Sequence, residues 1–366
     1  MSRLESSDGP RFTVATENEN LLQEQNLRAR PLSFRKEAIE DFDRERLLSE
    51  IENDKNKKIT SSSVPSGVVE YLTSASLLFK EQEFDLAQNF YRSVLKIDPN
   101  NELAIRGAAD CAAAIGHHEE AVRILQKLVE KHSSPGNYKR LGDELYELSY
   151  NEDAISAYLM ALRSAYFDGE ELFEIYKNLG NIFLRIGDPD SAEENYNKAY
   201  TLNPDSDILL VNFGSLALFR NEYDKALTRF REAVSVNDRN DKAWVGLAMI
   251  HREYGDSELA WANLEKALDS RPDNQSAIKL VADWAMKDNE IEKAMKYLDA
   301  YLNLHPDDAQ ISMWFAKFLY FSGRLREAQV EIEKALHLEP ALQGGVDVLT
   351  VIRSEIAEKK GNAFSD

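Results

Sequence analysis

Eight alanines recur through most of this chain at a nearly constant interval. The distances between consecutive members are 34, 33, 38, 34, 34, 34 and 34 residues, and the turn before each alanine most often contains glycine or asparagine. A period of this length, with two helical halves in each unit, predicts a solenoid in which every unit buries its apolar face only against its neighbours. The marker alanines are Ala87, Ala121, Ala154, Ala192, Ala226, Ala260, Ala294 and Ala328.

Each unit follows the same internal spacing. After the marker Ala192, a large residue follows at Tyr196 and a second small residue at Ala199. Spacings of four and three place these side chains on one helix face. A small residue in the first half of the unit, such as Gly180, allows the two helices to approach closely. Pro204 ends the second helix, because proline lacks the N–H and disfavours a helix in the residue before it.

This spacing resembles the tetratricopeptide repeat, a helix–turn–helix unit. The resemblance implies an all-α fold, a right-handed α-solenoid with eight repeats over residues 68–342, a capping helix at 343–360 and a disordered tail at 361–366. The one interval of 38 residues places four extra residues near Gly169–Leu172. Four residues are about one helical turn, so we expect the helices on both sides to run longer there.

Residues 1–67 do not follow the repeat. We expect a mostly disordered tail with a possible helix at 34–52, in which Phe34, Ala38 and Phe42 begin a thin apolar stripe. The tail has three alternative roles. It docks on the solenoid of its own chain, it binds a partner protein or a second copy of the chain, or it is a spacer.

Composition restricts the partners. The formal net charge is −20, and the residues after 67 contribute 33 basic and 51 acidic side chains to it. Such a surface repels phosphate backbones, so we expect a protein or peptide partner and no nucleic acid. No apolar run is long enough for membrane insertion, and the N-terminus lacks the apolar core of a secretory signal. The single cysteine, Cys111, lies among alanines, which predicts a buried thiol and a cytoplasmic protein.

No group of residues predicts catalysis, a cofactor or a metal site. His117 and His118 stand beside two glutamates, but adjacent residues on a turn between helices diverge, so we expect a solvated surface there. The other histidines are scattered over different units, and the sequence has no glycine-rich phosphate loop or Cys-x-x-Cys pair. The sequence predicts a protein that is not an enzyme.

The resemblance also implies a concave groove, lined by the second, fifth, ninth and twelfth positions of each first helix. Three units place an acidic residue four positions after a basic one, which cancels the charge. These pairs are Arg106 with Asp110, Lys139 with Asp143, and Lys279 with Asp283. The other groove positions supply the candidate peptide-binding residues Lys177, Asn181, Asn212, Lys242, Met249, Arg252 and Lys317.

Part of this set is similar to the carboxylate clamp that holds the acidic C-terminus of a heat-shock protein in chaperone-binding members of the family. The residues at matching positions are Lys177, Asn181, Asn212 and Lys242. Two ammonium groups and two amides can hold a carboxylate by charge-assisted hydrogen bonds. The fifth position, arginine in the clamp, is Gly246 here, and Arg252 along the same helix replaces it only in part.

The sequence therefore predicts an adaptor or scaffold that binds a protein segment or peptide in its concave groove. Two alternatives remain open. One is a chaperone or co-chaperone that uses the partial clamp, and the other is an assembly scaffold that self-associates through the N-terminal tail. An apolar strip beside Lys317 is a further expectation for the groove. Its members are Met286, Met313, Trp314 and Tyr320.

Overall fold

The computed structural model describes residues 66–163 and 167–362, which form helices and the turns between them, with no strand in these ranges. The expected all-α repeat solenoid is confirmed. The predicted helix at 34–52 and the end of the C-terminal tail lie outside the described residues. The helices are α4 (Ser66–Lys80), α5 (Phe84–Ile97), α6 (Glu102–Ala114), α7 (His118–Lys131), α8 (Pro135–Glu147), α9 (Asn151–Leu162), α10 (Gly169–Arg185), α11 (Pro189–Leu202), α12 (Asp207–Phe219), α13 (Tyr223–Val236), α14 (Asp241–Glu253), α15 (Ser257–Ser270), α16 (Gln275–Asp288), α17 (Ile291–Leu304), α18 (Ala309–Phe321), α19 (Leu325–Leu338) and α20 (Gly345–Asn362).

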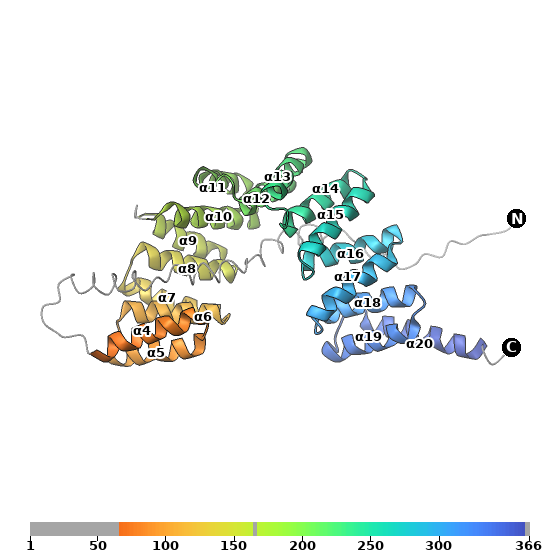
Figure 1. Cartoon of the computed structure of the whole chain (residues 1–366), viewed down its shortest axis with the longest axis horizontal. Coiled ribbons are helices and arrows are strands. Elements are labelled where there is room, and N and C mark those ends of the chain that lie inside the picture. The colour runs from red at the N-terminus through yellow and green to blue at the C-terminus, as the bar shows by residue number, and fades with distance from the viewer. Residues whose placement is uncertain (1–65, 164–166, 363–366) are drawn as a thin grey trace. The chain divides into compact units, whose positions relative to one another are not determined.

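The helices belong to two compact units, which meet in the sequence at Pro204 and Asp205. The unit that ends at Pro204 contains the consecutive pairs α4–α5, α6–α7, α8–α9 and α10–α11 (Figure 1). The second helix of one pair packs against the first helix of the next, as α5 packs on α6 and α7 packs on α8. Each pair therefore buries its apolar side against its neighbours in sequence, as a repeat stack requires.

The unit that begins at Asp205 contains the pairs α12–α13, α14–α15, α16–α17 and α18–α19 (Figure 1). The last helix, α20, packs against α18 and α19. Its Ile352 is only 1% exposed, which shows that one side of α20 is covered by the last pair. The terminal helix thus closes the apolar end of this unit, and it extends to Asn362.

Side-chain caps define where most of the first helices begin. Before every first helix from α6 to α18 stands an Asn, Ser or Asp whose side chain accepts a hydrogen bond from a backbone N–H in the first turn. Asn240, for example, accepts from the N–H of Ala243 at 2.9 Å. Each cap contributes about 1 kcal/mol, so these short polar residues fix the start of each pair.

One residue in each pair has left-handed backbone geometry at the turn between the two helices. Four of these residues are glycine, with φ between 76° and 85°: Gly116, Gly187, Gly255 and Gly323. The other four, with φ between 59° and 64°, are Gln82, Ser149, Asn221 and Asn289. The sequence predicts glycine or asparagine at this turn. Gln82 and Ser149 depart from that pattern, at a cost of about 1 kcal/mol each in a left-handed conformation.

Glycines in several first helices leave room for aromatic rings from second helices. A Cβ atom at Gly142 would lie 2.8 Å from the ring of Tyr158, and one at Gly180 would lie 2.4 Å from the ring of Tyr196. Real Cβ atoms do not approach a ring so closely, so glycine is the residue that fits. The close approach of the two helices in these pairs therefore depends on a missing side chain.

The extra residues of the 38-residue interval lengthen one helix. α10 has 17 residues, whereas α8 and α12 have 13 each. α9 has only 12 residues, so the expectation that both flanking helices run longer is wrong. The reason is the position of the cap. Asp168 accepts from the N–H of Glu171 at 2.8 Å and starts α10 early.

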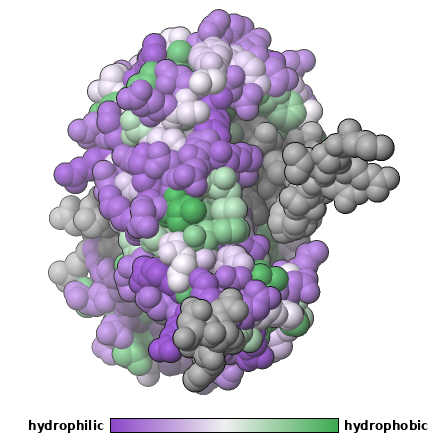
Figure 2. Space-filling view, turned by 90° about the vertical axis from the view of Figure 1, so that its right-hand side faces the viewer, coloured by the Kyte–Doolittle hydropathy of each residue, from purple (hydrophilic) through white to green (hydrophobic). Residues whose placement is uncertain are grey.

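The surface is mainly polar. The side of the molecule at the right of Figure 1 is seen face-on in Figure 2, where most residues are hydrophilic and the apolar ones gather mainly in a central patch. Among the helices that the structure describes, none combines the length and the apolar character that a membrane span needs.

Candidate functional site

The seven predicted peptide-binding residues are spread over four first helices. Two of them, Lys177 and Asn181, lie in α10 of the unit that ends at Pro204. The others lie in the second unit: Asn212 in α12, Lys242, Met249 and Arg252 in α14, and Lys317 in α18. The contacts of the two groups are therefore described separately.

Lys177 and Asn181 are engaged within their own unit. Each is only 8% exposed. The Nζ atom of Lys177 donates to Oε2 of Glu174 at 2.5 Å. The amide of Asn181 donates to the hydroxyl of Tyr146 at 3.1 Å, and its oxygen accepts from the hydroxyl of Tyr196 at 2.9 Å. These contacts give both side chains a packing role inside the stack.

A ring fills the position that carries arginine in a carboxylate clamp. A Cβ atom at Gly246 would lie 2.5 Å from the ring of Phe230 in the preceding pair. A longer side chain there would displace a buried aromatic residue, since Phe230 is 2% exposed. Asn212 is also buried, at 7% exposure, and Lys242 is half-buried. The local packing argues against a clamp at these positions.

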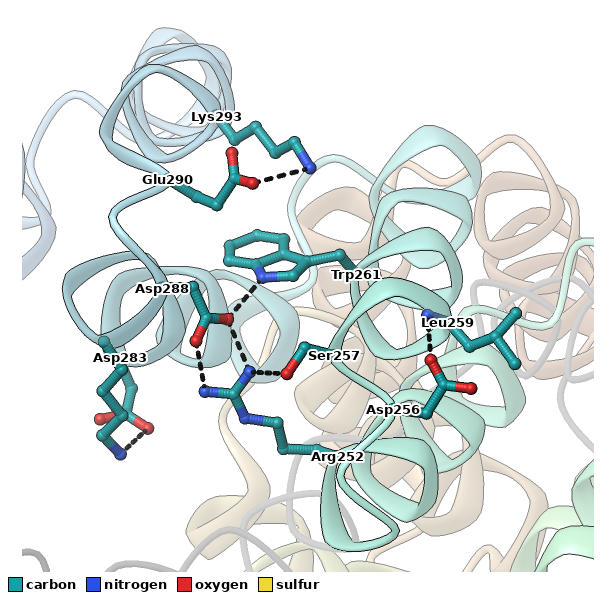
Figure 3. A network of polar contacts seen from close by, with 10 residues as sticks. Arg252, Asp256, Ser257, Leu259, Trp261, Asp283, Asp288, Glu290 and Lys293 are labelled. Atoms are coloured by element: carbon teal, nitrogen blue, oxygen red, sulfur yellow. Dashed lines mark hydrogen bonds and ion pairs between the residues drawn. The ribbon is translucent and has the colours of Figure 1, made fainter.

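Arg252 is the centre of a polar network between two consecutive pairs (Figure 3). Its guanidinium donates twice to Asp288, at the end of α16, with Nη1–Oδ2 and Nη2–Oδ1 distances of 2.6 and 2.9 Å. Nη1 also donates to Oγ of Ser257 at 3.1 Å, and the guanidinium lies 5.1 Å from the ring centroid of Trp284. Trp261 donates from Nε1 to Oδ2 of Asp288 at 2.8 Å. Arg252 therefore joins α14, α15 and α16.

This network stabilises the charged forms of Arg252 and Asp288. The hydrogen bond from Arg252 lowers the pKa of Asp288, and the same bond raises the pKa of Arg252. The groove position of Arg252 predicted a cationic site that could receive a peptide. The acidic partner comes instead from the next repeat, 36 residues away. Arg252 is thus a structural residue in the described part of the chain.

A cleft of about 440 Å³ adjoins the network. Its lining residues are Ser257, Glu258, Trp261, Ala262, Glu265, Asp288, Glu290 and Lys293. The Nζ atom of Lys293 lies 5.2 Å from the ring centroid of Trp261 and within 3.6 Å of carboxylate oxygens of Glu265 and Glu290. The ammonium group of Lys293 in α17 therefore already occupies the place beside Trp261 and the two carboxylates where a cation could bind (Figure 3).

The remaining candidates lie near the C-terminal end of the second unit. Lys317 is half-buried, and burial lowers its pKa. Met286 is 50% exposed, whereas Met249 and Trp314 are half-buried and pack against the large apolar core. The expected position of Met313 in the groove is wrong. This side chain is 3% exposed and belongs to the core, because it points between α18 and its neighbours.

One of the predicted charge pairs on the first helices is confirmed directly. Nζ of Lys139 lies 3.1 Å from Oδ2 of Asp143, as expected. Asp143 also accepts from the hydroxyl of Tyr158 at 2.8 Å. Acidic residues of these helices also pair with other bases: Glu102 with Arg106 and Asp283 with Lys287, four residues later in the same helix, and Asp110 with Arg140 in the next repeat. Only the last of these three contacts connects two repeats.

Two minor predictions have different outcomes. Cys111 is fully buried, as expected, and burial raises the pKa of its thiol to about 12. His118 is not solvated, because it is the first residue of α7 and its Nδ1 lies 2.7 Å from Oε2 of Glu144 in α8. His117 is 63% exposed, as expected for a turn. No group of three or more possible metal ligands occurs among the described residues.

Comparison with known families agrees with the helix pairs. Models of the tetratricopeptide repeat match residues 78–142, 173–206 and 211–275. The chain belongs to the tetratricopeptide repeat family. Two solved structures give the same fold for this tetratricopeptide repeat protein. The first is PilW, a type IV pilus biogenesis factor, with a TM-score of 0.52 and 15% identity; the match covers 59% of this chain and 99% of PilW. The second is a tetratricopeptide repeat protein from Parabacteroides merdae, with a TM-score of 0.51 and 15% identity; the match covers 78% of this chain and 99% of that protein.

Three relatives share the repeats at low identity. Protein O-mannosyl-transferase TMTC3 of Homo sapiens is 22% identical over 303 residues, which cover 78% of this chain and 33% of the relative. Anaphase-promoting complex subunit 3 of Schizosaccharomyces pombe is 26% identical over 162 residues, which cover 44% of this chain and 24% of the relative. The DnaJ homolog subfamily C member 7 homolog of Schizosaccharomyces pombe is 24% identical over 329 residues, which cover 84% of this chain and 65% of the relative. The tetratricopeptide repeat chain thus spans a third or less of the first two relatives, and the similarity concerns the repeats.

Proposed function

We propose that this tetratricopeptide repeat chain is a protein-binding scaffold, and that α14, α16 and α18 carry the surface that receives the partner. One observation supports this proposal most. These three successive first helices each place a half-buried lysine at a predicted groove position: Lys242, Lys279 and Lys317. Met249 and Met286 lie at further groove positions of α14 and α16. We name these five residues the lysine–methionine face.

The chemistry of the lysine–methionine face favours a segment with both carboxylate and apolar side chains. Burial partly desolvates the ammonium group of Lys317 and so lowers its pKa. A carboxylate of the partner would stabilise the charged form. Methionine side chains are flexible and polarizable, so they adapt to different apolar groups. The rest of the chain is strongly acidic. On this face Lys279 is followed by Asp283, so Lys242 and Lys317 are the places where an acidic segment meets the least repulsion.

Selection from a random peptide library on the immobilised full chain tests this proposal. We expect the selected peptides to be enriched in acidic residues next to apolar ones. The double substitution Lys242→Glu with Lys317→Glu should weaken a selected peptide by about tenfold or more, because it places like charges against the acidic groups. Calorimetry gives the affinities, and circular dichroism shows whether the variant is folded.

A control with the same change in net charge uses two exposed lysines of the second unit. Lys225 in α13 and Lys359 in α20 have side chains that are 72% and 61% exposed, and neither belongs to the lysine–methionine face. We expect Lys225→Glu with Lys359→Glu to leave the peptide affinity almost unchanged. An equal loss with both double variants would mean that only the overall charge matters, and the proposed face would then be wrong.

The other predicted functions have less support. One relative is named as a DnaJ homolog and another as a subunit of a multiprotein complex. The co-chaperone alternative needs the carboxylate clamp, and the contacts of Lys177, Asn181 and Arg252 give these residues other roles. Lys177→Glu would also place a second carboxylate beside Glu174, so it would test folding before it tests binding. Self-association through the N-terminal tail remains a prediction.

A further inference from the structure

The first helix of the stack has an apolar face that resembles the face of an interior repeat. The informative residue stands ten positions before the marker alanine of each pair, which is Leu77 in α4. The equivalent residues from α6 to α18 are Cys111, Glu144, Ile182, Leu216, Ile250, Trp284 and Phe318, and all are at most 9% exposed. Leu77 is 53% exposed. The same register position is therefore buried in seven helices and open in one.

The covering element in an interior repeat is the second helix of the preceding pair. α5 packs on α6, and Cys111 of α6 belongs to one apolar cluster with Tyr91 and Val94 of α5. Among the described residues, no second helix precedes α4. Tyr71, the sixth residue of α4, is also exposed, at 38%. A terminal repeat of a soluble solenoid normally has a polar outer face, so α4 has the composition of a helix that is covered.

The chain itself contains a segment with the pattern of a covering helix. In all eight second helices the marker alanine is followed four residues later by a large apolar or aromatic residue, as in Ala226 and Phe230. The same spacing occurs once before the first repeat, at Ala38 and Phe42, and Ile39 after the alanine corresponds to the apolar residue found there in several second helices. The similarity ends at Phe42, beyond which the sequence is more polar.

The segment is also within reach of α4. Residues 52–65 separate Ile51 from Ser66, and this connection spans up to about 50 Å when extended. α4 has 15 residues and is therefore about 22 Å long. The connection can lead the segment back along the whole of α4 in the antiparallel direction. Because both parts belong to one chain, a weak contact is favoured by a high effective concentration.

We propose that residues 34–51 cover α4 in the place of a preceding second helix, with Phe42 against Leu77. The surface at Leu77 is then an intramolecular docking site, and the N-terminal segment is the cap of the first unit, as α20 is the cap of the second. This docking is independent of the lysine–methionine face, since α4 and that face belong to different units.

Hydrogen exchange of the full chain tests the proposal from the side of the segment. We expect the amides of residues 34–51 to exchange about tenfold or more slowly than in a synthetic peptide of residues 30–55. Leu77→Asp should bring their exchange close to that of the peptide. Leu304→Asp is the matched control, because Leu304 is 57% exposed in α17, and it should have no effect. Equal exchange in the wild-type chain and the peptide overturns the proposal, and so does protection that survives Leu77→Asp while α6–α11 remain folded.

Thiol labelling tests it from the side of α4. In Leu77→Cys the new thiol is the accessible one, since the native Cys111 is fully buried. We expect Phe42→Asp to speed alkylation of this thiol by about tenfold, and the tail control Phe12→Asp to leave the rate unchanged. The labelling rate should not depend on protein concentration. A rate that rises on dilution, together with a fall in mass, would assign the covering segment to a second copy and overturn the intramolecular proposal.

Discussion

The helix pairs from α8 to α13 and those from α14 to α19 fill the same space in two ways. In the first group a glycine in the first helix receives an aromatic ring from the second helix, as Gly180 receives Tyr196. In the second group alanine replaces the glycine and an aliphatic residue replaces the ring, as with Ala248 and Leu264, both of which are fully buried. Interiors are packed to a nearly constant density. The repeat therefore constrains the combined volume of the two side chains more tightly than either residue alone.

The two groups also differ in their polar contacts. In two of the three pairs of the first group the ring carries a hydroxyl that donates to the first helix, from Tyr158 to Asp143 and from Tyr196 to Asn181. In the second group the main polar contact joins one pair to the next, through Arg252 and Asp288. Hydrogen bonds thus join the two helices of one repeat in these two pairs, and Asn178 and Asn181 also donate to tyrosines of the preceding repeat. In the second group an ion pair connects neighbouring repeats.

The largest loss of stability is expected when the glycine of a first-group pair is replaced by the alanine that the second group has at this position. Gly180→Ala should destabilise the chain by about 3 kcal/mol, because the new Cβ overlaps the ring of Tyr196. Adding Tyr196→Leu converts the pair to the other type and should recover about 1 kcal/mol or more of that loss. Urea unfolding measures both. Gly136→Ala is the control, since a Cβ there meets no atom within 4 Å. If the double variant is the less stable one, the two packing types are not interchangeable.

The ion pair between repeats should be the next most sensitive feature. Arg252→Lys keeps the charge but loses the paired hydrogen bonds to Asp288, and we expect a loss of about 2 kcal/mol. Arg140→Lys is the comparison, with Arg140 in α8 of the first group and Asp110 in α6 of the preceding pair. The Nε atom of Arg140 lies 3.4 Å from Oδ1 of Asp110, with side chains 36% and 25% exposed, so the loss should be about 0.5 kcal/mol or less. Similar losses for both would contradict the difference between the two groups.

Removing a tyrosine hydroxyl should lower the stability where the hydroxyl makes hydrogen bonds, and should not lower it where the hydroxyl makes none. Tyr158→Phe removes a donor to Asp143 and an acceptor of Asn178, and should cost about 1–2 kcal/mol. The hydroxyl of Tyr91 is buried without a hydrogen-bond partner in the described structure. Tyr91→Phe should therefore be neutral or stabilise by about 1 kcal/mol. Thermal unfolding can rank the two variants, and a larger loss for Tyr91→Phe would mean that its hydroxyl has a partner.

Turn substitutions should have effects of about 1 kcal/mol with opposite signs. Gln82→Gly and Ser149→Gly should each stabilise the chain by about that amount, because glycine adopts the left-handed conformation without strain. Gly255→Ala and Gly323→Ala should destabilise it by a similar amount. Urea unfolding of the four single variants checks the signs. Stabilisation by the two alanine variants would contradict the observed turn geometry.

The smallest effect concerns acid. The pKa of Asp288 is lowered by Arg252, so this carboxylate contributes stability above its ordinary pKa of about 3.9 and loses that contribution as the pH falls through its lower folded value. We expect Asp288→Asn to be less stable than the wild type at neutral pH, and the difference to shrink below about pH 4. A difference that stays constant with pH would mean that the charge of Asp288 does not contribute.

The repeat fold could be predicted because its determinants recur at fixed positions along the chain. Ala192 and Tyr196 repeat a spacing found in every unit, and helix geometry alone places them on one face. The interior of a pair therefore follows from local spacing. The length of α10 could be predicted only in part, because its start depends on the cap at Asp168.

The candidate site could not be predicted to the same degree, because its contacts connect different repeats. Arg252 meets Asp288, His118 meets Glu144, and both partners are more than 20 residues away. Such contacts depend on how one pair is rotated against the next. The same limit applies to Gly246, whose ring neighbour comes from the preceding pair. Single-helix rules therefore predicted groove positions but not the contacts that these side chains make with other repeats.

The carboxylate of Asp288 has a mechanical consequence. In a stack with contacts between neighbours only, tension applied at the two ends passes through every junction in series. At the junction of α14, α15 and α16, one carboxylate receives both the guanidinium of Arg252 and the indole N–H of Trp261. A displacement of α16 must stretch these short bonds together, so this junction should resist shear more than one closed by apolar contacts alone. Under load, the second unit would then extend first at its other junctions.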